Sequence, residues 1–114
     1  MTTTKISIQK PTVNDVITFT PQIIDKINGN SYTWDQMTGL LIYNTDTTKT
    51  LIITITSKLD SSNKSKIIKE IIDPLKMSVI NFLDIDFALG GTINVIYSGE
   101  STSGLIIPMA FTKP

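Results

Sequence analysis

Two apolar, β-branched runs, Gly39–Asn44 and Leu51–Thr56, flank a short polar linker. In the second run apolar residues alternate with mixed ones, so that one face of a strand there is apolar. The linker contains Thr45–Thr48, whose residue types favour turns. This pattern predicts a β-hairpin, and we take it as the centre of an all-β domain.

Further stretches with alternating or β-rich patterns predict the remaining strands. A turn is predicted at 28–31, an exposed loop at 57–66, a loop or single helical turn at 84–91, and another turn at 98–104. The segment 22–27 is apolar but of uncertain type. The predicted strands are 5–9, 13–20, 32–34, 77–82, 92–98 and 105–111, and in 92–98 the residues Ile93, Val95 and Tyr97 share one face.

The segment Lys66–Asp73 fits two structures. Its isoleucines recur at helical spacing, and Pro74 would end such a helix. A helix of barely two turns is marginal by itself, so we favour a strand. Pro108 lacks a backbone donor, which places the closing strand at a sheet edge or at a bulge.

These elements predict a single β-sandwich or jelly roll of about 7–8 short antiparallel strands, with room for one short helix. The length of 114 residues suits one domain. Residues 13–114 form the predicted sandwich. Residues 1–12 form either an N-terminal arm, which would pair with a neighbouring subunit, or a first strand.

Composition narrows the function. Ten basic residues, all lysine, balance ten acidic ones, and this neutral chain without arginine is unlike a nucleic-acid-binding protein. The chain lacks His and Cys, which removes imidazole acid–base chemistry, thiolate nucleophiles and thiolate zinc sites. No apolar run approaches the length needed to span a membrane. We therefore expect no enzyme activity, no cofactor, no metal, no nucleic acid and no membrane.

Three groups of residues are candidates for a metal site, a sugar-binding platform and a covalent cross-link. Asp84 and Asp86 are the nearest approach to a calcium site, but the other ligands of a calcium loop are missing, so solvated carboxylates are expected. Tyr32 and Trp34 share one face of a strand, either as core or contact residues or as a sugar-stacking platform. A Lys–Asn–Asp isopeptide link is a third option, which the sequence cannot place.

About two-thirds of the chain, from Gly39 to Phe111, resembles small structural proteins of tailed bacteriophages encoded near the major capsid protein. The resemblance rests on a Gly-led apolar strand ending in Asn, a Thr-rich strand, a strand leading into Pro, a Gly-led strand ending in aromatic-Ser, and an apolar closing strand. In this chain they are 39–44, 51–56, 71–74, 91–98 and 105–111.

The resemblance implies a non-enzymatic virion structural protein that decorates or stabilises the capsid, after assembly in the host cytoplasm. Its partners would be the major capsid protein, other virion proteins and further copies of itself. A neck or tail connector, or a carbohydrate-binding or adhesive module, is the alternative. The expected contact residues are Lys5, Ile6, Ile8, Tyr32, Trp34, Asp60 and Asn63.

Overall fold

The protein is a two-layered β-sandwich, and the all-β prediction is confirmed. The computed structural model describes residues 3–9, 20–34, 38–59, 61–80, 83 and 85–110. Within them the elements are β1 (Thr4–Lys5), β2 (Gln22–Ile23), β3 (Asn30–Thr33), β4 (Thr38–Asn44), β5 (Leu51–Thr56), β6 (Ile67–Ile72), β7 (Met77–Ile80), the 3₁₀ helix η1 (Ile85–Phe87), β8 (Thr92–Gly99) and β9 (Gly104–Ala110).

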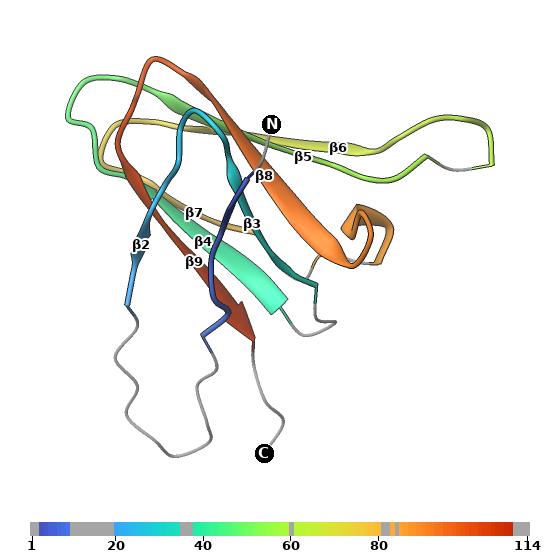
Figure 1. Ribbon diagram of the computed structural model, residues 1–114. Helices are drawn as coiled ribbons and strands as arrows, with labels where there is room; N and C mark the ends of the chain where they lie inside the picture. The colour runs from blue at the N-terminus through green and yellow to red at the C-terminus, as the bar shows by residue number, and fades with distance from the viewer. Residues whose placement is uncertain are drawn as a thin grey trace.

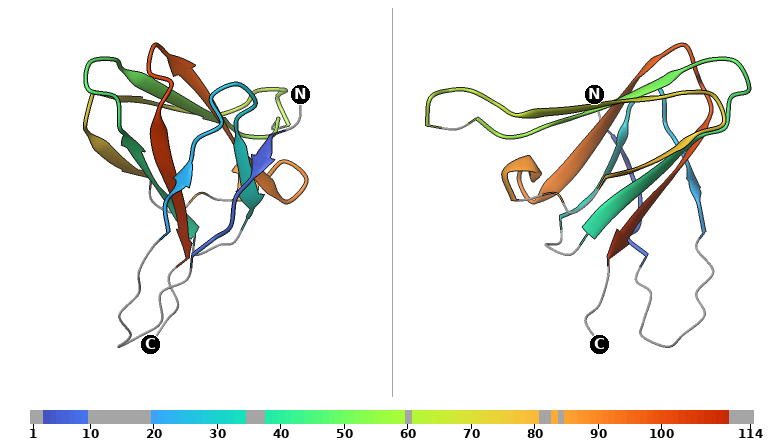
Figure 2. Two further views of the ribbon diagram at one scale, coloured as in Figure 1. Left: turned by 60° about the vertical axis from the view of Figure 1, so that its left-hand side comes forward. Right: turned by 180° about the vertical axis from the view of Figure 1, so that it is seen from behind.

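One sheet has five strands in the order β1-β3-β8-β5-β6, and the other has four in the order β2-β9-β4-β7. Figures 1 and 2 show the two layers and the long β5–β6 hairpin that projects from one end. The pairings are antiparallel except that of β1 with β3. Each sheet has a central strand that comes later in the sequence than both of its neighbours: β8 lies between β3 and β5, and β9 lies between β2 and β4.

The core lies between the sheets and is built from alternate residues of each strand. The predicted apolar faces of β5 and β8 are confirmed, because these residues point inward and are buried. Burying one such side chain contributes about 1.5–3 kcal/mol. The core residues of β4, β5, β8 and β9 are Leu40, Ile42, Leu51, Ile53, Ile55, Ile93, Val95, Tyr97 and Ile106.

The predicted central hairpin is wrong. Strands β4 and β5 lie in different sheets, and the connection between them carries the chain across the sandwich. Asn44, fully buried, holds this crossing. Its Nδ2 donates to the backbone oxygens of Lys49, at 2.8 Å, and Ile72, at 3.0 Å, while its Oδ1 accepts from Ser101 Oγ at 2.9 Å. These bonds favour the crossing over a local turn.

Several other predictions are confirmed. The segment 66–73 contains strand β6, which pairs with β5 along its length. The exposed loop before it closes this β5–β6 hairpin, and η1 is the single helical turn expected within 84–91. The predicted turn at 28–31 lies slightly earlier: the turn is 26–28, Gly29 has a φ of 78°, and Asn30 already begins β3. The strand predicted at 13–20 falls outside the described residues apart from Thr20.

Pro108 does not mark an edge strand, because β9 lies between β2 and β4. The pairing of β2 with β9 stops at Ile106, so the side of Pro108 away from β4 needs no strand donor. There the carbonyl oxygen of Pro108 accepts from the backbone N–H of Gln9 at 2.9 Å. A proline is tolerated in this inner strand because β2 is short.

Candidate functional site

The aromatic pair does not form an exposed platform. Tyr32 is only 2% exposed. Trp34 is half-buried, packs against the core, and donates from Nε1 to the backbone oxygen of Leu83 at 2.9 Å. Sugar stacking requires accessible ring faces, and the buried ring of Tyr32 offers none, so the two residues together do not form a stacking platform.

The described part of the N-terminal arm is bonded to its own chain. The backbone N–H of Ile6 donates to Ser31 at 2.8 Å, and that of Thr4 donates to Gly29 at 2.9 Å. Ile6 and Ile8 pack against the core, while Lys5 is exposed. Lys5 therefore lies on the surface, whereas Ile6 and Ile8 present little area to a partner.

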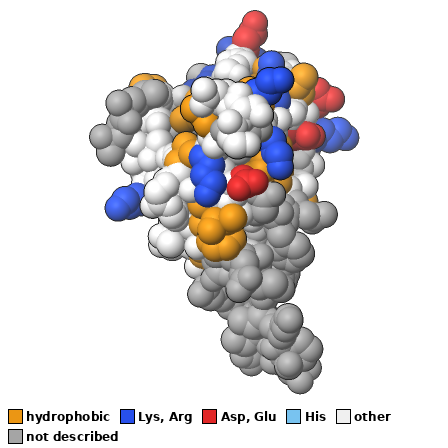
Figure 3. All heavy atoms as spheres, turned by 90° about the vertical axis from the view of Figure 1, so that its right-hand side faces the viewer, with side chains coloured by type: hydrophobic (Ala, Val, Ile, Leu, Met, Phe, Trp, Pro, Cys, Tyr) orange, Lys and Arg blue, Asp and Glu red, His pale blue; other side chains and the backbone are white. Residues whose placement is uncertain are grey.

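The predicted loop contacts lie at the tip of the β5–β6 hairpin. Asn63 is exposed with a φ of 59°, a conformation that asparagine tolerates in turns. Asp60 is outside the described residues. On this side of the molecule lysines and acidic groups are interspersed with hydrophobic side chains (Figure 3). This side of the molecule is therefore a mixed surface without a single sign of charge.

The candidate acidic pair is not assembled within the described residues. Asp86 lies in η1, where its carboxylate is 3.8 Å from Lys66 Nζ, and Asp84 is outside the described part of the chain. The described residues contain no group of three or more His, Cys, Asp or Glu that could hold a metal ion. The carboxylate of Asp86 thus takes part in an ion pair at the base of the hairpin.

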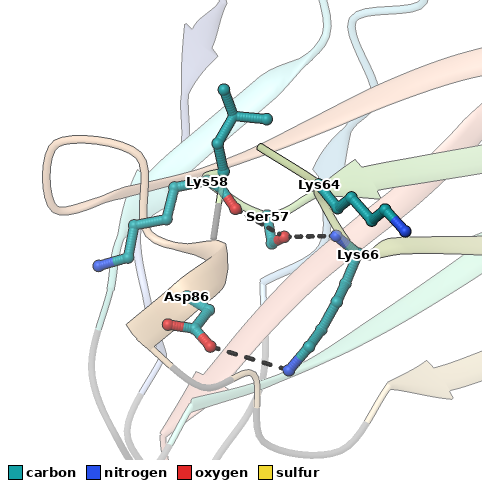
Figure 4. A pocket seen from close by; sticks show the side chains of 6 residues that line it. Ser57, Lys58, Lys64, Lys66 and Asp86 are labelled. Atoms are coloured by element: carbon teal, nitrogen blue, oxygen red, sulfur yellow. Dashed lines mark hydrogen bonds and ion pairs between the residues drawn. The ribbon is translucent and has the colours of Figure 1, made fainter. Parts of the chain in front are cut away.

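A small pocket of about 60 Å³ lies beside this ion pair. Ser57 Oγ accepts from the backbone N–H of Lys66 at 2.6 Å and donates to the carbonyl of Lys58 at 3.0 Å. The ammonium groups of Lys58 and Lys64 point away from each other, while Lys66 reaches Asp86 (Figure 4). Because these charges diverge, the pocket does not form a cradle for an anion.

A larger hollow of about 320 Å³ is lined, among the described residues, by Ser7, Gln9, Thr20 and Gln22. Its amide groups are already paired. Gln9 bonds the backbone N–H and carbonyl of Thr20, and Gln22 bonds those of Ser7. Two glutamines here replace strand-to-strand backbone bonds, and these four residues carry no titratable side chain.

The most distinctive surface is the outer face of the four-stranded sheet. Residues that alternate with the inward-facing Leu40, Ile42 and Ile106 point away from the core. They form cross-strand rows of apolar side chains without a charge. We call this surface the apolar face; it consists of Ile23, Leu41, Tyr43, Met77, Val79, Leu105, Ile107 and Met109.

Exposure rises from the centre of the apolar face toward its flanks. Ile107 is buried and Leu41 half-buried, whereas Val79 is 58% exposed, Met77 60% and Ile23 77%. A large contiguous apolar patch usually marks a binding surface. The flanking side chains give such a surface accessible area, and the central side chains between them are less exposed.

The five-stranded sheet differs. Its outer face is mostly hydroxyl, amide and ammonium groups, as expected of a sheet with one face in water. Along this face the outward-pointing residues are Ser31, Thr33, Ile52, Thr54, Thr56, Ile67, Lys69, Ile71, Thr92, Asn94, Ile96 and Ser98. The same chain thus builds one solvated sheet face and one apolar face, so general composition does not explain the difference.

Sequence reasoning missed the apolar face, although a signal was present. The runs Leu40–Tyr43 and Leu105–Ile107 are apolar at consecutive positions, and strands of this kind are typically covered on both faces.

The titratable groups with clear shifts support loops or lie in the core. The pKa of Asp25 is lowered by hydrogen bonds, chiefly from the Thr4 hydroxyl. Bonds from the backbone N–H groups of Thr48 and Lys49 lower the pKa of Asp46. Burial raises the pKa of Tyr32 and of Tyr97. None of these four groups belongs to the apolar face, so these shifts reflect folding.

Among the described residues, no helix has the length and apolar character needed to cross a membrane. Comparisons of the chain with known protein families, with curated protein sequences and with solved structures find no match. The geometry of the chain itself therefore carries the functional argument, and its most distinctive feature is the apolar face.

Proposed function

We propose that this protein is a non-enzymatic structural subunit that works by assembling with other protein subunits. The observation that carries this proposal is the apolar face, an uncharged sheet surface with strongly exposed Ile23, Met77 and Val79 at its flanks. Water is a poor solvent for such a surface, and covering it with another protein stabilises an assembly. A small ligand would contact a concave site with several convergent polar groups, and the apolar face does not offer such groups.

The assembly that we propose is the virion of a tailed bacteriophage, where the protein decorates or stabilises the capsid. The support is the resemblance of 39–111 to phage head proteins, together with the neutral, Ile- and Thr-rich sandwich. The side of the molecule around the hairpin tip, which includes Asn63, has lysine, acidic and hydrophobic side chains interspersed and is suited to polar contacts with a capsid lattice. Many weak contacts repeated over a lattice would sum to stable attachment.

Quantitative mass spectrometry of purified particles tests this proposal. A ratio of one copy per major capsid protein, or a simple fraction of it, supports decoration of the lattice. A few copies per particle would instead place the protein in the neck or tail. Its absence from washed particles would overturn the virion assignment.

A matched pair of variants connects the apolar face to this assembly. Val79→Lys places a charge on the apolar face, and Ile71→Lys places one at a similarly exposed position, 59%, on the other sheet. We expect the Val79→Lys protein to be depleted from particles and the Ile71→Lys protein to be incorporated normally. Equal incorporation of both would remove the apolar face from the proposed role.

A further inference from the structure

We infer that the apolar face packs against the same face of a second copy of this chain, related by a two-fold axis. This inference deepens the proposed assembly function by naming the partner of the face. In such a dimer each protomer contributes its four-stranded sheet to the interface. The solvated five-stranded sheets then form the two outer surfaces.

Charge is the first reason to choose a second copy. A two-fold interface brings identical patches together, so any charged residue near the axis meets a like charge. The apolar face has no charged side chain, and its one polar side-chain atom is the Tyr43 hydroxyl. Nucleic acid and anionic lipid surfaces bind through lysine or arginine, which the face does not offer. An uncharged copy of the same surface is its natural complement.

Shape is the second reason. Twisted sheets pack face to face at about 10 Å with their strands roughly 30° apart, and this requires that both sheets twist in the same sense and to a similar degree. Two copies of one sheet satisfy the condition automatically. Large side chains also follow one another along β4 and β9 of the apolar face without a gap other than Gly39.

The size of the face fits a modest dimer. Strands β4 and β9 have seven residues each, so they are about 23 Å long, and four strands span roughly 19 Å. Because β2 and β7 are shorter, the face is at most about 440 Å² in projection. Even if the accessible surface of the face is about twice its projection, two copies together bury less than the roughly 2,000 Å² or more of an obligate interface. We therefore expect dissociation in the micromolar range rather than an obligate dimer.

The sheet edges are a less suitable route to self-association. The free edge of β6 has Lys69 and Glu70 at its centre. Antiparallel pairing of two β6 strands about a central two-fold axis would set Lys69 against Lys69 or Glu70 against Glu70, and such contacts are unfavourable. The free edge of β7 has only four residues. Face-to-face packing avoids both problems.

Sedimentation equilibrium over a wide concentration range tests the dimer. The wild-type average mass should rise from 12.6 kDa toward twice that value as concentration increases. Val79→Lys should weaken dimerisation by about a hundredfold or more, because it buries a charge from each copy. Ile71→Lys should dimerise like the wild type. Urea titration confirms that both variants are folded.

Thiol labelling gives a second measurement that does not depend on introducing charge. The chain has no cysteine, so a single Met77→Cys or Ile67→Cys reports on one position, and the two native side chains are 60% and 61% exposed. At concentrations where the wild type is dimeric, we expect Met77→Cys to react roughly tenfold more slowly than when dilute. The Ile67→Cys rate should not depend on concentration.

A wild-type protein that stays at 12.6 kDa up to millimolar concentration would overturn the inference. So would a dimer that Ile71→Lys disrupts and Val79→Lys does not, since that result moves the interface to the other sheet. The proposed function is tested separately. A monomeric protein that is abundant in particles would end the dimer and keep the virion role, whereas a dimeric protein absent from particles would do the reverse.

Discussion

Ser101 Oγ donates a buried hydrogen bond of 2.9 Å to Asn44 Oδ1, although the two residues are 57 positions apart. Both residues are fully buried. Through the amide of Asn44 this bond connects the end of β4, the crossing to β5, the end of β6 and the turn between β8 and β9. One polar cluster thus fixes where the chain changes sheet.

Replacing Asn44 by Leu should therefore cost about 3 kcal/mol or more in the free energy of unfolding. The change leaves the buried carbonyl of Ile72 and the part-buried carbonyl of Lys49 without their side-chain donor, and each such loss costs roughly 1–3 kcal/mol when the group is buried. Ser101→Ala removes one hydroxyl and should cost about 1 kcal/mol. Urea denaturation followed by tryptophan fluorescence measures both. Equal effects of the two changes would show that the amide is not the centre of the cluster.

The two buried tyrosines should respond in opposite directions to loss of their hydroxyls. Tyr97 Oη donates to Asn30 Oδ1 at 2.7 Å, so Tyr97→Phe should destabilise by about 1 kcal/mol. Tyr32 Oη has no hydrogen-bond partner among the described residues, so Tyr32→Phe should be neutral or stabilise by up to about 1 kcal/mol. Thermal unfolding compares them directly. A loss of stability in Tyr32→Phe would reveal a bonded hydroxyl.

Two glycines with positive φ should differ in their tolerance of alanine. Gly99 has a φ of 85°, and a Cβ there would lie 2.6 Å from the backbone oxygen of Thr50. Gly90 has a φ of 63° with nothing within 4 Å of the added carbon. Gly90→Ala should cost only the backbone strain of about 1–2 kcal/mol, and Gly99→Ala should cost clearly more. Chemical denaturation ranks them, and the reverse order would contradict the tight approach at Gly99.

Acid should weaken the fold through Asp25 and Asp46. Hydrogen bonds lower the pKa of both carboxyls below 3.8 in the folded state, so the unfolded chain takes up protons first. Their contribution is present above the unfolded pKa of about 4 and is lost as pH falls through the lowered folded values. The urea concentration at the midpoint of unfolding should fall as the pH is lowered from 6 to 3. The midpoint of the double variant Asp25→Asn, Asp46→Asn should fall less over the same pH range. An equal fall would assign the acid sensitivity to other groups.

The sequence predicted what depends on neighbouring residues. The alternation in 51–56 and 92–98 identified both strands and their buried faces, because the two-residue repeat is a local property of a pleated strand. The ambiguous segment 66–73 forms a strand because β5 provides a partner along its whole length. The helical spacing of its isoleucines did not decide the structure, because pairing with β5 stabilises the strand.

Strand partners and exposure depend on distant residues, and there the sequence failed. Nothing local in Thr45–Thr48 distinguishes a hairpin turn from a crossing between sheets, since the choice depends on what Asn44 meets in space. For the same reason the sequence left open whether Tyr32 was buried or exposed. The apolar face required knowledge that β2, β9, β4 and β7 lie side by side.

The late position of the two central strands has a consequence for synthesis. β8 joins β3 to β5, and β9 joins β2 to β4, so the five-stranded sheet lacks its middle until β8 has left the ribosome, and the four-stranded sheet until β9 has. At about 5–20 residues per second the apolar strands β4 and β5 wait for seconds beside a growing chain. Closing such long loops also makes sandwiches slow folders, in milliseconds to seconds. We therefore expect the sandwich to close only after β9 has emerged, and until then chaperones have time to bind the nascent strands.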